Sequence, residues 1–201
     1  MVLDGKIAVT VFKKVRQARH EIKAYCIAPD QPVIPLGELK RIVGQMYHLA
    51  INVHELPYKS DRVKGLMERY IDRVTIYVKE DLDEYWKRFT VVKELCHVMN
   101  DEPDDWSYEG VNTLKNLLTE YTLHQDSAAS RASQSEIFAE IAAVELLYPF
   151  EQRAIDINGG SGKPIAEIAR WYHLPELIVS RSLLEGYHGT VAEIWGLVGS
   201  E

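Results

Sequence analysis

The segment from residue 88 to residue 101 carries side chains whose types and spacing could do chemistry. It is expected to form an amphipathic helix, and its residues 93–97 read KELCH. In the zinc motif H-E-x-x-H, two histidines four positions apart bind the metal, and the glutamate is the general base for the metal-bound water. Glu94 and His97 stand at the motif's glutamate and second histidine, but Lys93 replaces the first histidine. A protonated amine has no lone pair to offer a metal, so one ligand of the motif is missing.

A second segment, residues 136–149, carries two carboxylates four positions apart, Glu136 and Glu140, followed by an apolar run that ends at Pro149. On a helix, these two carboxylates lie on one face. Taken alone, Glu94 and His97 are typical of an ordinary helix with one polar face, because short motifs often match by chance. The second segment is what favours a site built from two helices.

Three stretches together resemble the ImmA/IrrE family of metallopeptidase-like proteins. They are RFT at residues 88–90 before the KELCH segment, E-x-x-A-E at residues 136–140, and E-L-L-x-P at residues 145–149. The family pattern runs RFT-x-x-HELGH and then E-x-x-A-N-x-F-A-x-E-L-L-x-P. The resemblance covers about residues 37–185 of the chain.

The resemblance implies a role for each matching residue. Glu94 would be the catalytic general base, His97 and Glu136 would be zinc ligands, and Glu140 would orient one of these ligands without binding the metal itself. Besides the lysine, the chain departs from the family pattern at Cys96, where the family has glycine, and at Glu140, where it has asparagine. The resemblance further implies a cytoplasmic protein associated with a phage or mobile element, with a helix-turn-helix repressor as its partner or substrate.

Lys93 leads to two interpretations, which both stay open at this point. In the first, zinc is bound by His97, Glu136 and a third group, and the protein is a metalloendopeptidase. In the second, the Lys93 ammonium supplies the positive charge of the metal among Glu94, Glu136 and Glu140, and the protein is a non-catalytic binding or regulatory protein. Because catalytic zinc sites typically present three protein ligands, we expect the metal-free arrangement.

Composition limits the classes of protein that the chain can belong to. Its 201 residues suffice for one ordinary domain, and 46% hydrophobic with 26% charged residues is typical of a soluble globular protein. A formal charge of −7 argues against general binding to phosphate backbones, so no direct nucleic-acid contact is expected. Two cysteines without a C-x-x-C pair indicate reduced thiols. No apolar run approaches the ~20 residues of a membrane span, and we expect a cytoplasmic protein.

Periodicity and turn residues predict the elements. Residues 3–27 contain a strand-like run at 7–12 but also fit a helix over 6–26, and a helix or an irregular arm is favoured. A proline-marked linker follows at 30–35. Helices are expected over 36–49, 82–99, 108–123 and 133–148, strands over 50–56, 65–70 and 73–78, two short helices beginning at Pro164 and Pro175, and a terminal helix over 190–198.

The expected fold class is α+β. A small, mostly antiparallel sheet from about residue 51 to residue 78 packs on a helical body that contains both site helices. We expect an N-terminal arm and linker over 1–35, a metallopeptidase-like core over 36–150, and a helical segment packed on the core over 151–201.

Several other features are weaker. His124 is either a replacement metal ligand or, as we expect, a surface histidine, and Cys96 is expected to be a packed thiol. The acidic loop at 101–105 lacks the glycine and spacing of an EF-hand, and residues 158–164 lack the residues that a P-loop places around Gly-Lys. The C-terminal helical pair has helix-turn-helix proportions, but its acidic residues favour packing over DNA reading. Trp195 is expected to dock on the body of the protein.

Overall fold

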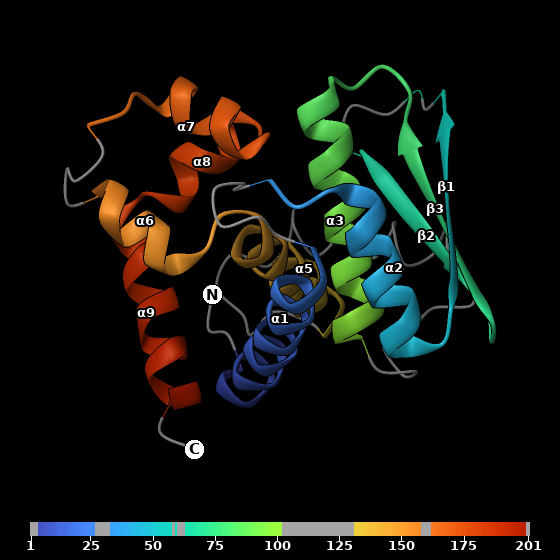
Figure 1. Ribbon diagram of the computed structural model, residues 1–201, viewed down its shortest axis with the longest axis horizontal. Helices are drawn as coiled ribbons and strands as arrows, with labels where there is room; N and C mark the ends of the chain where they lie inside the picture. Colours follow the sequence, from blue (N-terminus) through green and yellow to red (C-terminus); the bar gives the residue numbers. More distant parts are fainter. Residues whose placement is uncertain are drawn as a thin grey trace.

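The computed structural model describes residues 4–26, 33–57, 59, 63–101, 131–157 and 162–199. The expected helix over 108–123, the acidic loop after residue 101, and His124 lie outside this part of the chain. In order along the chain, the elements are α1 (Gly5–Cys26), α2 (Leu36–Tyr47), β1 (Ala50–Leu56), β2 (Gly65–Arg69), β3 (Arg73–Lys79), α3 (Glu84–Asn100), α5 (Arg131–Leu147), α6 (Phe150–Ile157), α7 (Ile165–Tyr172), α8 (Glu176–Ser182) and α9 (Glu185–Gly199) (Figure 1).

The sheet has three strands in the order β1-β3-β2. β2 and β3 form the antiparallel hairpin that the sequence predicted, whereas β1 runs parallel to β3. Every second residue of β3 is buried, namely Val74, Ile76 and Val78, which places the apolar face of the sheet against the helices. The α+β class is therefore confirmed, and the sheet is mixed, with one parallel and one antiparallel pair.

α3 is the central helix of the molecule. It contacts the sheet through β2 and β3 on one side and α5 on the other, and it also contacts α1 and α2 (Figure 1). The helix begins where the Asp83 side chain accepts a hydrogen bond from the backbone N–H of Trp86, an N-cap that also favours the helix dipole. Its residues from Phe89 to Met99 are almost all buried. Because α3 and α5 lie side by side, residues about forty positions apart meet.

α1 is a single helix, so the strand-like interpretation of residues 7–12 was wrong. Its buried residues recur with helical spacing and pack on α5 and α9, and they are Ala8, Val11, Phe12, Val15, Ala18 and Ile22. The β-branched residues that suggested a strand lie within this helix, because tertiary packing overrides a weak local propensity.

The C-terminal helices attach to α5 through a buried polar contact. The Arg153 guanidinium of α6 pairs with the Glu145 carboxylate of α5, and both side chains are fully buried. Trp195 of α9 donates a hydrogen bond from Nε1 to Glu145 Oε2 at 3.0 Å and meets the Phe12 ring edge-on at 4.9 Å. The expected docking of Trp195 is thus observed, on a helix that begins at Glu185, five residues before the predicted start. Among the described residues, no helix combines the length and apolar character of a membrane span.

Candidate functional site

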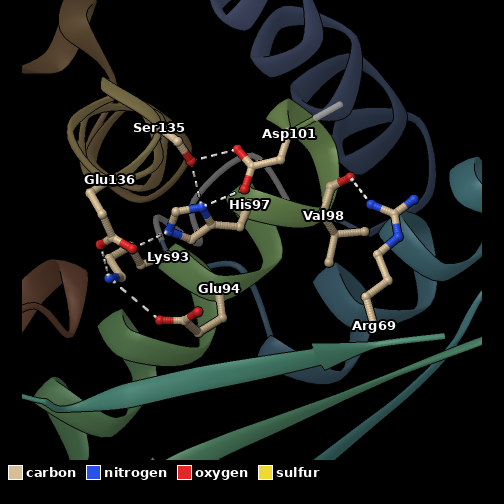
Figure 2. Close-up of polar contacts among 8 residues, drawn as sticks. All are labelled: Arg69, Lys93, Glu94, His97, Val98, Asp101, Ser135 and Glu136. Atoms are coloured by element: carbon tan, nitrogen blue, oxygen red, sulfur yellow. Dashed lines mark hydrogen bonds and ion pairs between the residues drawn. The ribbon is translucent and has the colours of Figure 1, made fainter. Parts of the chain in front are cut away.

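Lys93 lies between two carboxylates at the contact of α3 with α5 (Figure 2). Its Nζ donates a hydrogen bond to Glu136 Oε2 at 2.8 Å and lies 3.4 Å from Glu94 Oε1, an ion-pair distance without a hydrogen bond. The side chain of Glu136 is 43% exposed, whereas that of Glu94 is only 6% exposed. The Lys93 ammonium is therefore the positive charge that neutralises a buried carboxylate and a half-exposed one.

His97 lies one helical turn after Lys93 and is held at both ring nitrogens. Its Nδ1 lies 2.9 Å from Asp101 Oδ2 and 3.1 Å from Ser135 Oγ, and Ser135 Oγ donates to Asp101 Oδ1 at 2.7 Å. On the other side of the ring, Nε2 lies 3.3 Å from Glu136 Oε1 without making a hydrogen bond. The two oxygens of Glu136 thus face two different cations, Oε2 the lysine and Oε1 the histidine (Figure 2).

Ser135, His97 and Asp101 do not form a nucleophilic triad. In such a triad the carboxylate holds one ring nitrogen and the other nitrogen takes the proton of the serine. Here Ser135 and Asp101 contact the same nitrogen, Nδ1, and Nε2 faces a carboxylate instead. The serine hydroxyl therefore helps to orient the imidazole, and no free imidazole nitrogen faces it to take its proton.

Cys96 is a packed thiol, as the sequence predicted. It is completely buried on α3. Burial raises the pKa of the thiol far above its ordinary value, and the nearby carboxylates of Glu94 and Asp101 raise it further. Because the thiolate is the reactive form, Cys96 is unsuited to be a nucleophile.

The charges of the cluster support one another. Burial lowers the pKa of Lys93, but the attraction of Glu94 and Glu136 outweighs it, and the net result is a raised pKa. Burial likewise lowers the pKa of His97, but its interactions with the carboxylates of Asp101 and Glu136 raise the pKa to about 10. Burial raises the pKa of Glu136, yet His97 and Lys93 hold it well below its usual range. At neutral pH, Lys93 and His97 then carry two positive charges, the same as a zinc ion bound by two neutral imidazoles.

The start of β2 covers the buried carboxylate. A Cβ atom at Gly65 would lie 2.3 Å from Cγ2 of Thr90 and 3.4 Å from Oε1 of Glu94. Only glycine allows the strand to approach α3 this closely, because any side chain would push the two elements apart. The close approach explains why Glu94 is removed from solvent while Glu136, on the opposite side of the ammonium, reaches the surface.

Four of the five predicted site residues meet in this cluster, namely Lys93, Glu94, His97 and Glu136. Glu140, the fifth, is exposed on α5 and makes no ion pair with Lys93. Lys93 is therefore paired with two of the three carboxylates that were expected around it.

Two residues of the site were not predicted from the sequence, Asp101 and Ser135. Asp101 follows His97 by four positions, a spacing that brings side chains together at a helix end. Ser135 directly precedes Glu136 and faces the imidazole only because α5 packs on α3. Asp101 therefore had a local signal in the sequence, whereas Ser135 had none.

A model of the IrrE N-terminal-like domain matches residues 47–182, which is more than half of the chain and includes every residue of the cluster. The chain belongs to the IrrE N-terminal-like family. The family membership that the sequence motifs indicated is therefore confirmed. A comparison with curated proteins found no match.

The residues of this IrrE N-terminal-like protein do not fit the zinc ion that the family resemblance implies. Two side chains, His97 and Glu136, could donate to a metal, whereas the ammonium of Lys93 lies between Glu94 and Glu136 and has nothing to donate. Across the part of the chain that the structure describes, no group of three or more histidine, cysteine or acidic side chains is arranged to hold a metal ion.

Proposed function

We propose that this IrrE N-terminal-like protein is a non-catalytic member of its family that works without a metal and regulates another protein by binding it. The observation that carries the proposal is the position of Lys93 Nζ, 2.8 Å from Glu136 Oε2 and 3.4 Å from Glu94 Oε1. An ammonium at this position pairs with the family's general base and with one of its ligand carboxylates.

Hydrolysis of a peptide bond needs an electrophile or an activated nucleophile. Among the described residues, the cluster offers neither an electrophile nor an activated nucleophile. Ser135 has no free imidazole nitrogen to take its proton, the Cys96 thiol stays protonated, and Glu94 is paired with a cation instead of a metal-bound water. The residues at the positions of the family site then serve to join α3 to α5.

The partner that we propose is a helix-turn-helix repressor, and the association with a phage or mobile element is part of the same proposal. The family resemblance supports both points. The acidic character of the chain, with a formal charge of −7, supports a protein partner over a direct contact with DNA.

A metallopeptidase is the second candidate, favoured by the observation that Glu94, His97 and Glu136 still meet at one place. Such an enzyme would need a further metal ligand from outside the described residues, of which His124 is one candidate from the sequence. The two candidates differ in zinc content, in cleavage and in the role of Glu94.

The test mixes the purified protein with a helix-turn-helix repressor encoded beside it and follows binding by calorimetry and cleavage by mass spectrometry. We expect the wild-type protein and its Glu94→Gln variant to bind the repressor equally well and to leave it intact. Cleavage by the wild-type protein that the Glu94→Gln variant has lost would contradict the proposal and establish the metallopeptidase.

A further inference from the structure

We propose that the free edge of β1 is a dimer interface, at which β1 pairs in antiparallel orientation with β1 of a second copy of the chain. Among the described strands, the order β1-β3-β2 leaves β1 with a hydrogen-bonded neighbour on one side only. Such an edge offers a row of backbone N–H and C=O groups to another strand. The cluster around Lys93 lies at the opposite edge, where Gly65 of β2 approaches Glu94, so the inference goes beyond the proposed function and does not depend on it.

Two hydrogen bonds of the parallel β1–β3 pair show which backbone groups reach the free edge. The Ala50 N–H donates to the Asp72 carbonyl at 2.9 Å, and the Leu56 carbonyl accepts from the Glu80 N–H at 3.0 Å. In a strand, the backbone groups of alternate residues point to the same neighbouring strand. The N–H and C=O groups of the intervening residues therefore point away from β3, and these residues are Ile51, Val53 and Glu55.

β1 lacks the features with which proteins usually block an exposed strand edge. It runs for seven residues, Ala50–Leu56, its register with β3 is unbroken, and it contains no proline and no lysine. Its only acidic residue, Glu55, makes an ion pair of 2.8 Å with Lys87 of α3. The strand is therefore open to pairing along its length.

The backbone and the charges of β1 fit a second copy of β1 about a two-fold axis at Val53. In this register Val53 lies opposite Val53, and Ile51 of one copy lies opposite Glu55 of the other. These are the residues whose backbone groups point to the free edge, so each of them can exchange hydrogen bonds with the residue opposite. Each Glu55 carboxylate faces an apolar side chain, and no like charges meet across the axis.

The side chains on the outer face of the sheet match in the same register. Asn52 of one copy lies opposite His54 of the other, a pair that can form a hydrogen bond. Ala50 lies opposite Leu56, whose side chain is 37% exposed in the single chain and gains an apolar neighbour. Because one register satisfies the backbone, the charges and the apolar side chains together, a second copy of the chain is the partner that this edge fits.

The first test measures the mass of the full-length protein in solution by sedimentation equilibrium over a series of concentrations. We expect a dimer, with a mass twice the 23.0 kDa of one chain, that dissociates on dilution. Any other mass at the highest concentration, including the mass of the monomer, would overturn the proposal.

Two double variants test the register. Asn52→Glu combined with His54→Glu places like charges opposite each other on the outer face and should weaken dimerisation about tenfold or more. Asn52→Lys combined with His54→Glu is the matched control, because it places opposite charges at the same positions and should keep the dimer. Equal dimerisation of these two variants would overturn the pairing of β1 with β1.

Val53→Pro tests the backbone contact. The Val53 N–H points to the free edge, so proline removes a donor from the proposed dimer and none from the β1–β3 pair. We expect a monomer with the circular dichroism spectrum of the wild-type protein. A folded Val53→Pro protein that dimerises as strongly as the wild type would overturn the proposal, and if this variant does not fold, the two double variants decide.

Discussion

Replacing Lys93 by methionine removes the ammonium and keeps a flexible apolar chain of similar length. The variant leaves the Glu94 carboxylate, only 6% exposed, and the Glu136 carboxylate without the cation that lies between them. Glu136 keeps His97 as a partner, but Glu94 loses the only described ion pair that it makes. The expected result is a large loss of folding stability at neutral pH.

The magnitude follows from burial. Removing one partner of a fully buried ion pair costs about 3–5 kcal/mol, because the remaining charge is left without compensation. Lys93 is 21% exposed and Glu136 is 43% exposed, and water therefore screens part of the interaction. We expect Lys93→Met to lower the free energy of unfolding by about 2–3 kcal/mol at pH 7.

The assay is urea unfolding followed by circular dichroism, with Lys87→Met as the matched control. Lys87 lies on the same helix and is 19% exposed, and its Nζ makes an ion pair of 2.8 Å with Glu55, which is 52% exposed. The control should cost much less than Lys93→Met, since Glu55 keeps its water. Adding Glu94→Gln to Lys93→Met should restore part of the stability. If Lys93→Met is as mild as the control, the charge of Lys93 does not hold the site together.

Three further predictions concern pH and packing. The pKa of His97 is raised from 6.5 to about 10. The contribution of His97 to the stability of the fold is therefore complete below pH 6.5 and should decline as the pH rises to 10. Melting curves recorded at a series of pH values should show this decline for the wild-type protein and not for His97→Gln. Gly65→Ala should lower the free energy of unfolding by about 1–3 kcal/mol, because its methyl group meets Thr90, and Thr90→Ser should recover part of this loss. Glu145→Gln should cost about 3–5 kcal/mol in urea unfolding, because the Arg153 guanidinium is fully buried and loses its counter-charge; a loss below 1 kcal/mol would contradict that role.

The site helices could be predicted because their signals are local. The spacing of Glu94 and His97 on α3 and the position of Glu136 at the start of a second apolar helix depend on helix geometry alone. Their meeting could be expected only through the family resemblance, since nothing in either segment specifies which helix it packs against. The hairpin of β2 and β3 was equally local, with a short turn at Ile71 and Asp72.

Other features depend on tertiary structure and have no local signal. Ser135 reaches His97 only after α5 has packed on α3, and the parallel pairing of β1 with β3 depends on the path of the chain between them. The first helix was ambiguous because its β-branched residues favour a strand while its apolar spacing favours a helix. Burial against α5 and α9 decides between them.

The central claim is that the Lys93 ammonium takes the place of a metal ion between α3 and α5. Elemental analysis of the purified wild-type protein, before and after treatment with a chelator, tests this claim most directly. We predict well below one zinc per chain before treatment and the same melting temperature afterwards. One zinc per chain that the chelator removes with a loss of stability, and that His97→Ala fails to bind, would contradict it.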